Sequence, residues 1–328
     1  MGSATGFDVS VIVPTYNRAN LIKETLNTIL AQTHPPAEII VVDDGSTDDT
    51  EAVVLGYGSP IRYHKPENGG PSRARNIGVS LARFPWIALC DSDDLWLPTK
   101  LERQIRLHTT FPDVEYSFTD FVFVEAGRWL TAAKFASAPS EFWPRPSREA
   151  EETIWIYDTQ LYDRVLRFQP IFVSTLLISR DRYQRLGGYD ETFSRALAED
   201  FEFTLRNAAR PPIGALAEPL VGIRRHPGNN SGNLLGVLLG EVRILEHALA
   251  NHQPPTGTAE IIRDEIEIRR LQAFDLAFAT GRLDTARELA PLLGPSEHDL
   301  RLRTKLAVAR LPTPLAKIVQ RLLSAARG

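Results

Sequence analysis

The run from Trp86 to Asp94 constrains the fold of this chain more than any other segment. It begins with an apolar stretch of strand length, Trp86–Cys90, which stops at three carboxylates within the next four residues. Apolar stretches of this kind are typical of buried strands in an α/β sheet, whose ligands bind at the carboxyl ends of the strands. Neighbouring carboxylates repel one another unless a cation lies among them, and their oxygens suit Mg²⁺ or Mn²⁺. The run therefore predicts a metal–diphosphate site.

Strand and helix patterns alternate through the first part of the chain. The expected strands are Val9–Val13, Glu38–Val42, Ile61–His64 and Trp86–Cys90. Between them lie the helical patterns Ala19–Gln32, Ser46–Leu55 and Ser72–Ala82. Three of the four strands end in polar or acidic clusters, which predicts that one edge of the sheet is functional. The alternation indicates an α/β fold with a parallel sheet and helices on both faces.

The organisation changes after Asp94. The patterns predict a helix over Lys100–His108, strands over Val114–Val124 and Val173–Ile178, and a helix that begins at Glu199. Two stretches are expected to be loops around the site, Ala126–Glu152 and Ile223–Ser231. From Leu234 onward we expect only helices, including a helix-turn-helix with its break at Gly281. We therefore predict two halves of a sheet domain, 1–125 and 126–233, and a helical region, 234–328.

Composition excludes several classes of protein. The net charge of −4 is too small to indicate nucleic acid as a partner. The single cysteine, Cys90, permits no disulfide framework within the chain and fits a reducing compartment. The N-terminus has no apolar signal region, and no stretch approaches the ~18 apolar residues of a membrane span. We expect a cytoplasmic protein, with a peripheral position on a membrane as an open alternative.

Each acidic or aromatic cluster at a strand end has a structural explanation beside its functional one. Asp93 could ligate a divalent cation that bridges the phosphates of a nucleotide-sugar, or belong to a solvated acidic turn. Asp44 could accept a hydrogen bond from a nucleobase N–H, or cap the helix that follows. Tyr16 could stack on a base, or lie in an ordinary turn.

The clusters at helix starts and in the later loop are equally ambiguous. The turn before the third helix, with Arg73 and Arg75, would suit a phosphate, but its glycines could serve the turn alone. Asp200 could remove a proton from a hydroxyl group, or be one of the acids that the helix dipole favours in a first turn. His226 could touch a diphosphate or metal, or be solvated.

Together these motifs resemble those of the inverting glycosyltransferases of family 2, which have the GT-A fold. The resemblance covers residues 8–232, in the family's order and spacing. It rests on Ser10–Arg18, Val41–Asp48, Asn68–Gly78, Asp91–Asp94, Gly187–Glu191, Glu199–Asp200 and Arg225–Ser231. It implies a GT-A fold, which is a Rossmann-like, mostly parallel central sheet flanked by helices, here with a C-terminal helical appendage outside the resemblance.

The resemblance also implies a role for each matching residue. Asp93 would ligate Mn²⁺ or Mg²⁺, and Asp200, ahead of Glu199, would be the general base. His226 and Arg225 would lie near the diphosphate and the acceptor. A nucleotide pocket would be formed by Pro14, Tyr16, Arg18, Asp44, Arg73, Arg75, Asp91 and Ser92. The implied activity is metal-dependent, inverting transfer from a nucleotide-sugar, by expectation UDP-linked, to a hydroxyl of a glycan or lipid-linked acceptor in surface polysaccharide or glycolipid synthesis.

Three questions stay open at this point. A nucleotidyltransferase also places acids around a metal at a strand end, and a non-catalytic family member would bind nucleotide or glycan only. The stretch Leu300–Gly328 contains seven Lys or Arg residues and no acid. Its helices could lie on an anionic membrane surface, or pack on their own domain or on a second subunit of a homo-oligomer.

Overall fold

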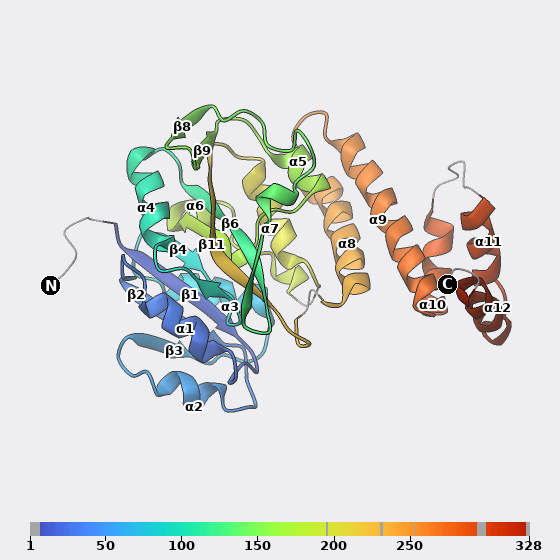
Figure 1. Ribbon diagram of the computed structural model, residues 1–328, viewed down its shortest axis with the longest axis horizontal. Helices are drawn as coiled ribbons and strands as arrows, with labels where there is room; N and C mark the ends of the chain where they lie inside the picture. Colours follow the sequence, from blue (N-terminus) through green and yellow to red (C-terminus); the bar gives the residue numbers. More distant parts are fainter. Residues whose placement is uncertain (1–6, 195, 230–231, 253, 294–299, 326–328) are drawn as a thin grey trace. The chain divides into compact units, whose positions relative to one another are not determined.

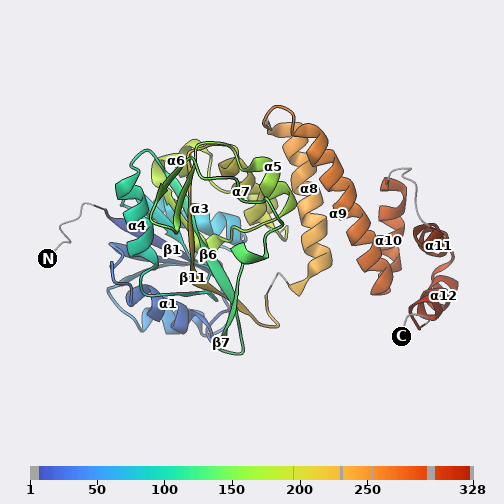
Figure 2. The same cartoon turned by 45° about the horizontal axis from the view of Figure 1, so that its top comes forward.

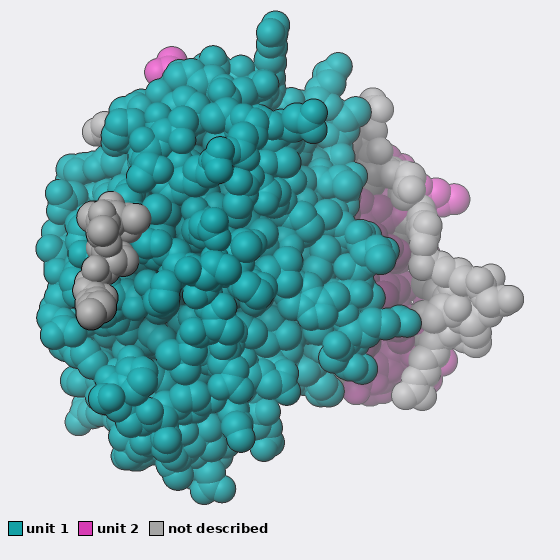
Figure 3. All heavy atoms as spheres, turned by 60° about the vertical axis from the view of Figure 1, so that its left-hand side comes forward, with its two compact units in different colours: residues 1–195, 199–228 teal, residues 196–198, 229–328 magenta. Residues whose placement is uncertain are grey.

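The structure, a computed structural model, describes residues 7–194, 196–229, 232–252, 254–293 and 300–325 (Figure 1). The chain forms two compact units. The first comprises residues 1–195 and 199–228, and the second comprises residues 196–198 and 229–328 (Figure 3). All the residues predicted to form the site belong to the first unit.

The first unit is built on one mixed sheet. Its strands are β1 (Val9–Thr15), β2 (Glu38–Asp43), β3 (Ile61–His64), β4 (Trp86–Leu89), β5 (Leu95–Trp96), β6 (Tyr116–Glu125), β7 (Arg128–Ala133), β8 (Arg148–Ala150), β9 (Ile154–Tyr157), β10 (Leu176–Ser179) and β11 (Ile213–Arg225). They lie in the order β3-β2-β1-β4-β10-β6-β11-β9-β8, with β5 paired to β11 and β7 paired to β6. The pairs β2–β3, β1–β2, β1–β4 and β6–β11 are parallel, while β10 is antiparallel to both neighbours. Polar segments that follow β1 and β4 therefore meet at one edge.

Seven helices flank this sheet in the described part of the first unit (Figures 1 and 2). They are α1 (Ile22–Leu30), α2 (Thr50–Leu55), α3 (Pro71–Leu81), α4 (Lys100–Thr110), α5 (Tyr162–Arg167), α6 (Arg180–Arg185) and α7 (Glu199–Ala208). The helix α3 approaches the sheet closely because Gly78 has no side chain: a Cβ there would lie 2.2 Å from Ile12 Cγ2. Close contact fixes α3, and with it Arg75, against β1.

The first four predicted strands are confirmed as β1 to β4, and so is the expected central sheet flanked by helices. The sequence pattern reveals β1, β2 and most of β4 because they are buried, largely apolar runs. Two loop predictions were wrong in part. Residues 126–152 contain β7, β8 and a short 3₁₀ turn, Phe135–Ser137. Tertiary packing, including the 4.4 Å contact between the Phe135 and Trp143 rings, orders this stretch without a sequence period.

The second wrong loop prediction concerns the end of β11. Ile223–Arg225 belong to this strand rather than to a loop, because they pair with Phe123–Glu125 of β6. The run Val173–Ile178 was also predicted entirely as strand. Its first part, Val173–Thr175, is a 3₁₀ turn, and the strand β10 begins at Leu176.

The second unit contains α8 (Leu234–Asn251), α9 (Ala259–Ala279), α10 (Leu283–Leu289), α11 (Leu300–Ala309) and α12 (Thr313–Ala325). Its core contains Phe274 and Phe278 of α9, packed with leucines of α8 and α10. The predicted break at Gly281 is confirmed, since this residue has φ +75° between α9 and α10. In the described residues, no helix is long and apolar enough to cross a membrane.

Candidate active site

The turn after β4 directs its acids into different surroundings. Asp94 points inward: its carboxylate accepts hydrogen bonds from Ser174 Oγ at 2.5 Å and from the Arg224 backbone N–H at 3.2 Å. Burial raises the pKa of Asp94 well above its ordinary value, and the neighbouring Asp93 and Asp91 carboxylates raise it further. Ser174 Oγ also accepts the backbone N–H of Asp91 at 2.9 Å. Asp94 therefore shapes the turn.

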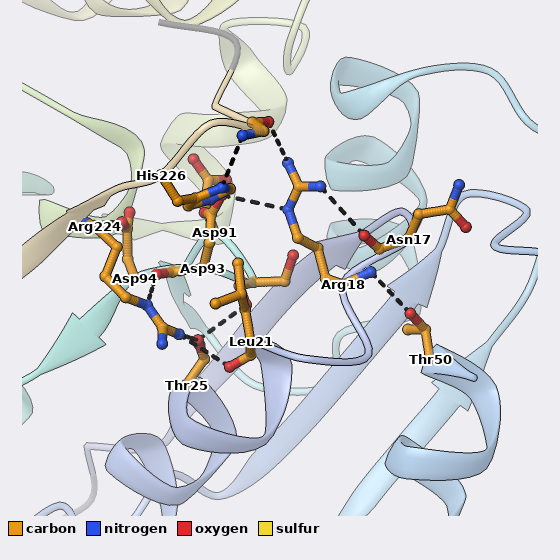
Figure 4. A network of polar contacts seen from close by, with 12 residues as sticks. Asn17, Arg18, Leu21, Thr25, Thr50, Asp91, Asp93, Asp94, Arg224 and His226 are labelled. Carbon is orange, nitrogen blue, oxygen red and sulfur yellow. Dashed lines mark hydrogen bonds and ion pairs between the residues drawn. The ribbon is translucent and has the colours of Figure 1, made fainter. Parts of the chain in front are cut away.

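Asp93 lies on the other side of the turn, where three segments meet (Figure 4). Its Oδ2 is 3.0 Å from His226 Nε2 and 3.4 Å from Arg18 Nε. The Gly228 backbone N–H donates to His226 Nδ1 at 3.1 Å, so Nε2 carries the proton that faces Asp93. Arg18 also donates to the Gly228 carbonyl at 3.1 Å. The structure thus brings together three of the predicted residues, from the ends of β4, β1 and β11.

Arg75 forms a second cluster with acids from two distant segments. Its side chain is buried; Nη1 contacts Glu199 Oε1 at 2.7 Å, and Nη2 contacts Asp91 Oδ1 at 3.0 Å. Burial alone would lower the pKa of Arg75, but the Asp91 and Glu199 carboxylates outweigh it and raise that pKa well above the ordinary value. Burial raises the pKa of Asp91, which Arg75 opposes. Arg75 Nε is buried and finds no hydrogen-bond partner in the described structure.

Asp200 is the second residue of α7, directly after Glu199. Burial raises the pKa of Asp200 to about 7, the Glu199 carboxylate adds to the rise, and Arg75 opposes it. A carboxylate whose pKa lies near neutrality matches the requirement for a general base that works near pH 7. Glu199, by contrast, is engaged with Arg75.

Asp44 has a structural task at the other end of the site. Its carboxylate accepts the backbone N–H groups of Gly69 and Gly70, both at 2.8 Å, and the Asn68 side-chain amide at 3.0 Å. It thereby holds the turn that starts α3. The Asp44 carboxylate can accept roughly four hydrogen bonds. Three of these positions are occupied, which leaves one for a ligand N–H. Tyr16, at the end of β1, is 47% exposed and available for stacking.

The remaining predicted residues lie around these clusters. Pro14 is buried within β1. Ser92 is buried too, and its carbonyl accepts the Thr25 hydroxyl at 3.0 Å. Arg73 lies against the glycine turn, where a Cβ at Gly69 would come within 2.3 Å of Arg73 Cδ. Within the described residues, Arg73 makes no contact with the carboxylates of either acidic cluster.

The structure places Arg225 apart from Asp93. Its guanidinium pairs with Glu125 at 2.9 Å and lies 3.6 Å from the centre of the Phe123 ring. Sequence reasoning missed its neighbour Arg224, which donates to the Asp93 carbonyl and contacts Glu24 at 2.8 Å. Adjacent strand residues point to opposite faces, so only one of the two arginines could reach the acidic turn.

The Asp93 carboxylate is the group at this turn that fits a divalent cation. Its oxygens suit Mn²⁺ and Mg²⁺, whereas His226 presents the protonated Nε2 to Asp93 at 3.0 Å and so offers a cation no lone pair in this arrangement. Within the described ranges, no group of three or more His, Cys, Asp or Glu side chains could hold a metal ion. A cation here would take its other ligands from phosphate and water.

Comparisons with known proteins identify the family and the fold. The family model described as glycosyl transferase family 2 matches residues 10–171. An uncharacterized glycosyltransferase of Rickettsia typhi is 35% identical over 231 residues, which are 70% of this chain and 68% of that protein. The succinoglycan biosynthesis protein ExoO of Rhizobium meliloti is 42% identical over 100 residues, 30% of this chain and 29% of that protein. The structure of S. aureus TarS 1-349 in complex with UDP-GlcNAc matches 98% of this chain and 91% of that chain, with a TM-score of 0.61 and 20% identity, which indicates a shared fold.

Proposed function

The chain belongs to glycosyltransferase family 2, and on that premise we propose that it transfers a sugar, with inversion, from a UDP-sugar to a hydroxyl group of a glycan or lipid-linked acceptor. The observation that carries this proposal is the meeting of Arg75 with Asp91 and Glu199, directly beside Asp200 in the chain. It supports a site in which a buried arginine can meet the phosphates of a donor and a separate carboxylate, that of Asp200, can act as the base.

On the donor side, Arg18 and His226 would turn from Asp93 toward the diphosphate. Both are partly exposed, and both already meet at one carboxylate oxygen. Tyr16 and the remaining lone pair of Asp44 would hold the base. A UDP-sugar as the donor is supported by the structurally similar TarS, which was solved in complex with UDP-GlcNAc. A nucleotide fits these groups because each supplies one stacking, hydrogen-bonding or charged contact of the kind that fixes a ligand's orientation.

Asp93 would hold Mn²⁺ or Mg²⁺. The cation would supply charge neutralisation at the diphosphate leaving group. The fit rests on donor type, since carboxylate oxygen is a preferred ligand of both ions.

Asp200 would perform the proton transfer. Its carboxylate takes the proton of the acceptor hydroxyl as that oxygen attacks the anomeric carbon. The bond from this carbon to the phosphate oxygen breaks, and its electron pair leaves with the diphosphate. A base on the opposite face of the sugar from the leaving group gives a single displacement, which inverts the anomeric centre. The name of the relative ExoO supports an acceptor of the polysaccharide class.

The first experiment is a thermal-shift panel of UDP, GDP, TDP and CMP, each with and without Mn²⁺. We expect UDP with Mn²⁺ to raise the melting temperature by about 5–10 °C at a concentration a hundredfold above its Kd. Asp93→Asn should remove the Mn²⁺-dependent part, whereas Asp181→Asn, an exposed acid of α6, should leave it unchanged. No shift with any nucleotide would contradict the donor site.

Turnover is then tested by release of UDP from a set of UDP-sugars. Slow hydrolysis of one donor in the absence of acceptor would support transferase chemistry. Formation of pyrophosphate from a nucleoside triphosphate would instead support a nucleotidyltransferase. Binding of UDP with neither reaction would indicate a non-catalytic family member.

A further inference from the structure

The last two helices of the second unit combine exposed apolar side chains with exposed cations. Four large apolar residues lie within this stretch and are solvent-exposed: Leu300 (81%), Leu311 (36%), Leu315 (54%) and Ile318 (58%). Arg303, Arg310 and Lys317 are exposed among them. No acid occurs from Leu300 to the end of the sequence. We call the exposed residues Leu300, Arg310, Leu311, Leu315, Lys317 and Ile318 the C-terminal basic segment.

The helix α12 shows why this composition is unusual. Its inner side packs into the core of the second unit through Ala316, which is fully buried, and Val319, which is partly buried. A helix that has buried one face normally presents charged or polar residues on the other. Here Leu315 and Ile318 remain more than half exposed after the core is complete. The exposed side of α12 therefore has apolar surface that the chain itself does not cover in the described residues.

The cations of this segment are also available. Lys305 of α11 cannot face a membrane, since it is buried and its ammonium group forms an ion pair with Asp275. Arg310 and Lys317, by contrast, are exposed and lie within a few residues of Leu311, Leu315 and Ile318. Leucine or isoleucine flanked by Arg or Lys is the composition that places a helix in the plane of an anionic membrane surface.

We propose that the C-terminal basic segment docks the protein peripherally on an anionic lipid membrane. Leu315 and Ile318 would enter the headgroup–acyl boundary, and Arg310 and Lys317 would meet lipid phosphates. A soluble polyanion would satisfy the cations but leave the apolar side chains in water. Symmetric pairing of two copies through this segment would bring cations of both copies together, because the segment contains no acid that could form ion pairs with them.

The test is co-sedimentation of the full chain with vesicles of phosphatidylcholine that contain about one third phosphatidylglycerol, and with vesicles of phosphatidylcholine alone. We expect binding to the anionic vesicles that weakens as salt is raised, and little binding to the neutral ones. Each cation near such a surface changes the partition coefficient about fivefold. Lys317→Glu combined with Ile318→Ser should therefore lower it at least about tenfold.

The matched control is Arg263→Glu combined with Ile268→Ser, a pair of exposed residues on α9 of the same unit. This control should bind vesicles like the unchanged protein, and both double variants should keep the melting temperature and the UDP response of the first unit. No binding to anionic vesicles, or equal loss in both double variants, would overturn the proposal. So would a dimer in light scattering that Lys317→Glu/Ile318→Ser dissociates, because a second copy would then cover the segment.

Discussion

Replacing Asp200 by Asn should remove activity and at the same time stabilise the protein in a pH-dependent way. The carboxyl group of Asp200 has its pKa raised from the ordinary 3.8 to about 7 by burial and by Glu199. For an acid whose pKa is higher in the folded state, stability is greatest when the group is protonated. This stability is lost as the pH rises from the pKa of the unfolded state to the pKa of the folded state. Asn carries no charge at any pH and escapes this loss.

The size of the effect follows from the two pKa values. Between about pH 5 and pH 8, the ionisation of Asp200 costs the folded state about 2–3 kcal/mol. The advantage of Asp200→Asn over the unchanged protein should grow by that amount across this range. This corresponds to about 5–10 °C in melting temperature for a unit of this size. At each pH the two proteins are compared in the same buffer, so contributions from other titrating groups cancel.

The assay is urea unfolding, or thermal melting, of both proteins at several pH values. Asp181→Asn is the matched control, since Asp181 is also the second residue of its helix, α6, but is exposed. Its effect should stay within about 0.5 kcal/mol and should not depend on pH. A constant difference between Asp200→Asn and the unchanged protein from pH 5 to pH 8 would refute the account of Asp200 as a base whose ionisation destabilises the folded state.

Three further outcomes are expected. With chemistry rate-limiting, kcat/KM should rise about tenfold between pH 6 and pH 8, because the ionised fraction of Asp200, with its pKa of about 7, rises tenfold; a flat profile in single-turnover measurements would contradict this. Asp44→Ala should destabilise the first unit by about 2–3 kcal/mol in urea unfolding, since three donors lose one acceptor, and should weaken UDP binding. Arg224→Met should lower kcat/KM about 10–100-fold by loosening the Asp93 turn, whereas Arg225→Met should leave turnover near normal; equal effects would exclude the positioning role of Arg224.

The local sequence pattern was sufficient to predict the strands that position the candidate site. β1, β2 and β4 are short buried runs whose ends are marked by polar residues, so both their existence and the edge that holds the candidate site follow from composition and spacing. The sequence could not predict which residue of each polar pair faces the site. Arg224 and Arg225 are neighbours, and only the pairing of β11 with β5 and β6, more than 80 residues away, decides which one meets Asp93.

The order within residues 126–152 was hidden for a related reason. Its strands β7 and β8 pair with β6 and β9, and its aromatic residues pack on rings such as Phe118 and Tyr157. None of these partners creates a period in the local sequence. The sequence also could not predict that Asp44 holds the turn before α3 as well as facing the candidate site. The three groups that donate hydrogen bonds to it lie 24 to 26 residues further along the chain.

The charges of the site argue for a cation beyond those that the protein supplies. Burial raises the pKa of Asp94 well above its ordinary value, and Asp200, with its pKa of about 7, is only about half ionised at pH 7. Three other carboxylates face two arginines: Asp91, Asp93 and Glu199 against Arg18 and Arg75. A diphosphate would add at least two negative charges to this excess. Bringing these charges beside Asp93 without a compensating cation is electrostatically unfavourable, because low-dielectric surroundings strengthen like-charge repulsion. This excess of negative charge supports the proposed metal requirement. It predicts that UDP binding without a divalent ion strengthens when Asp93→Asn removes one carboxylate, a result that isothermal titration in EDTA can confirm or refute.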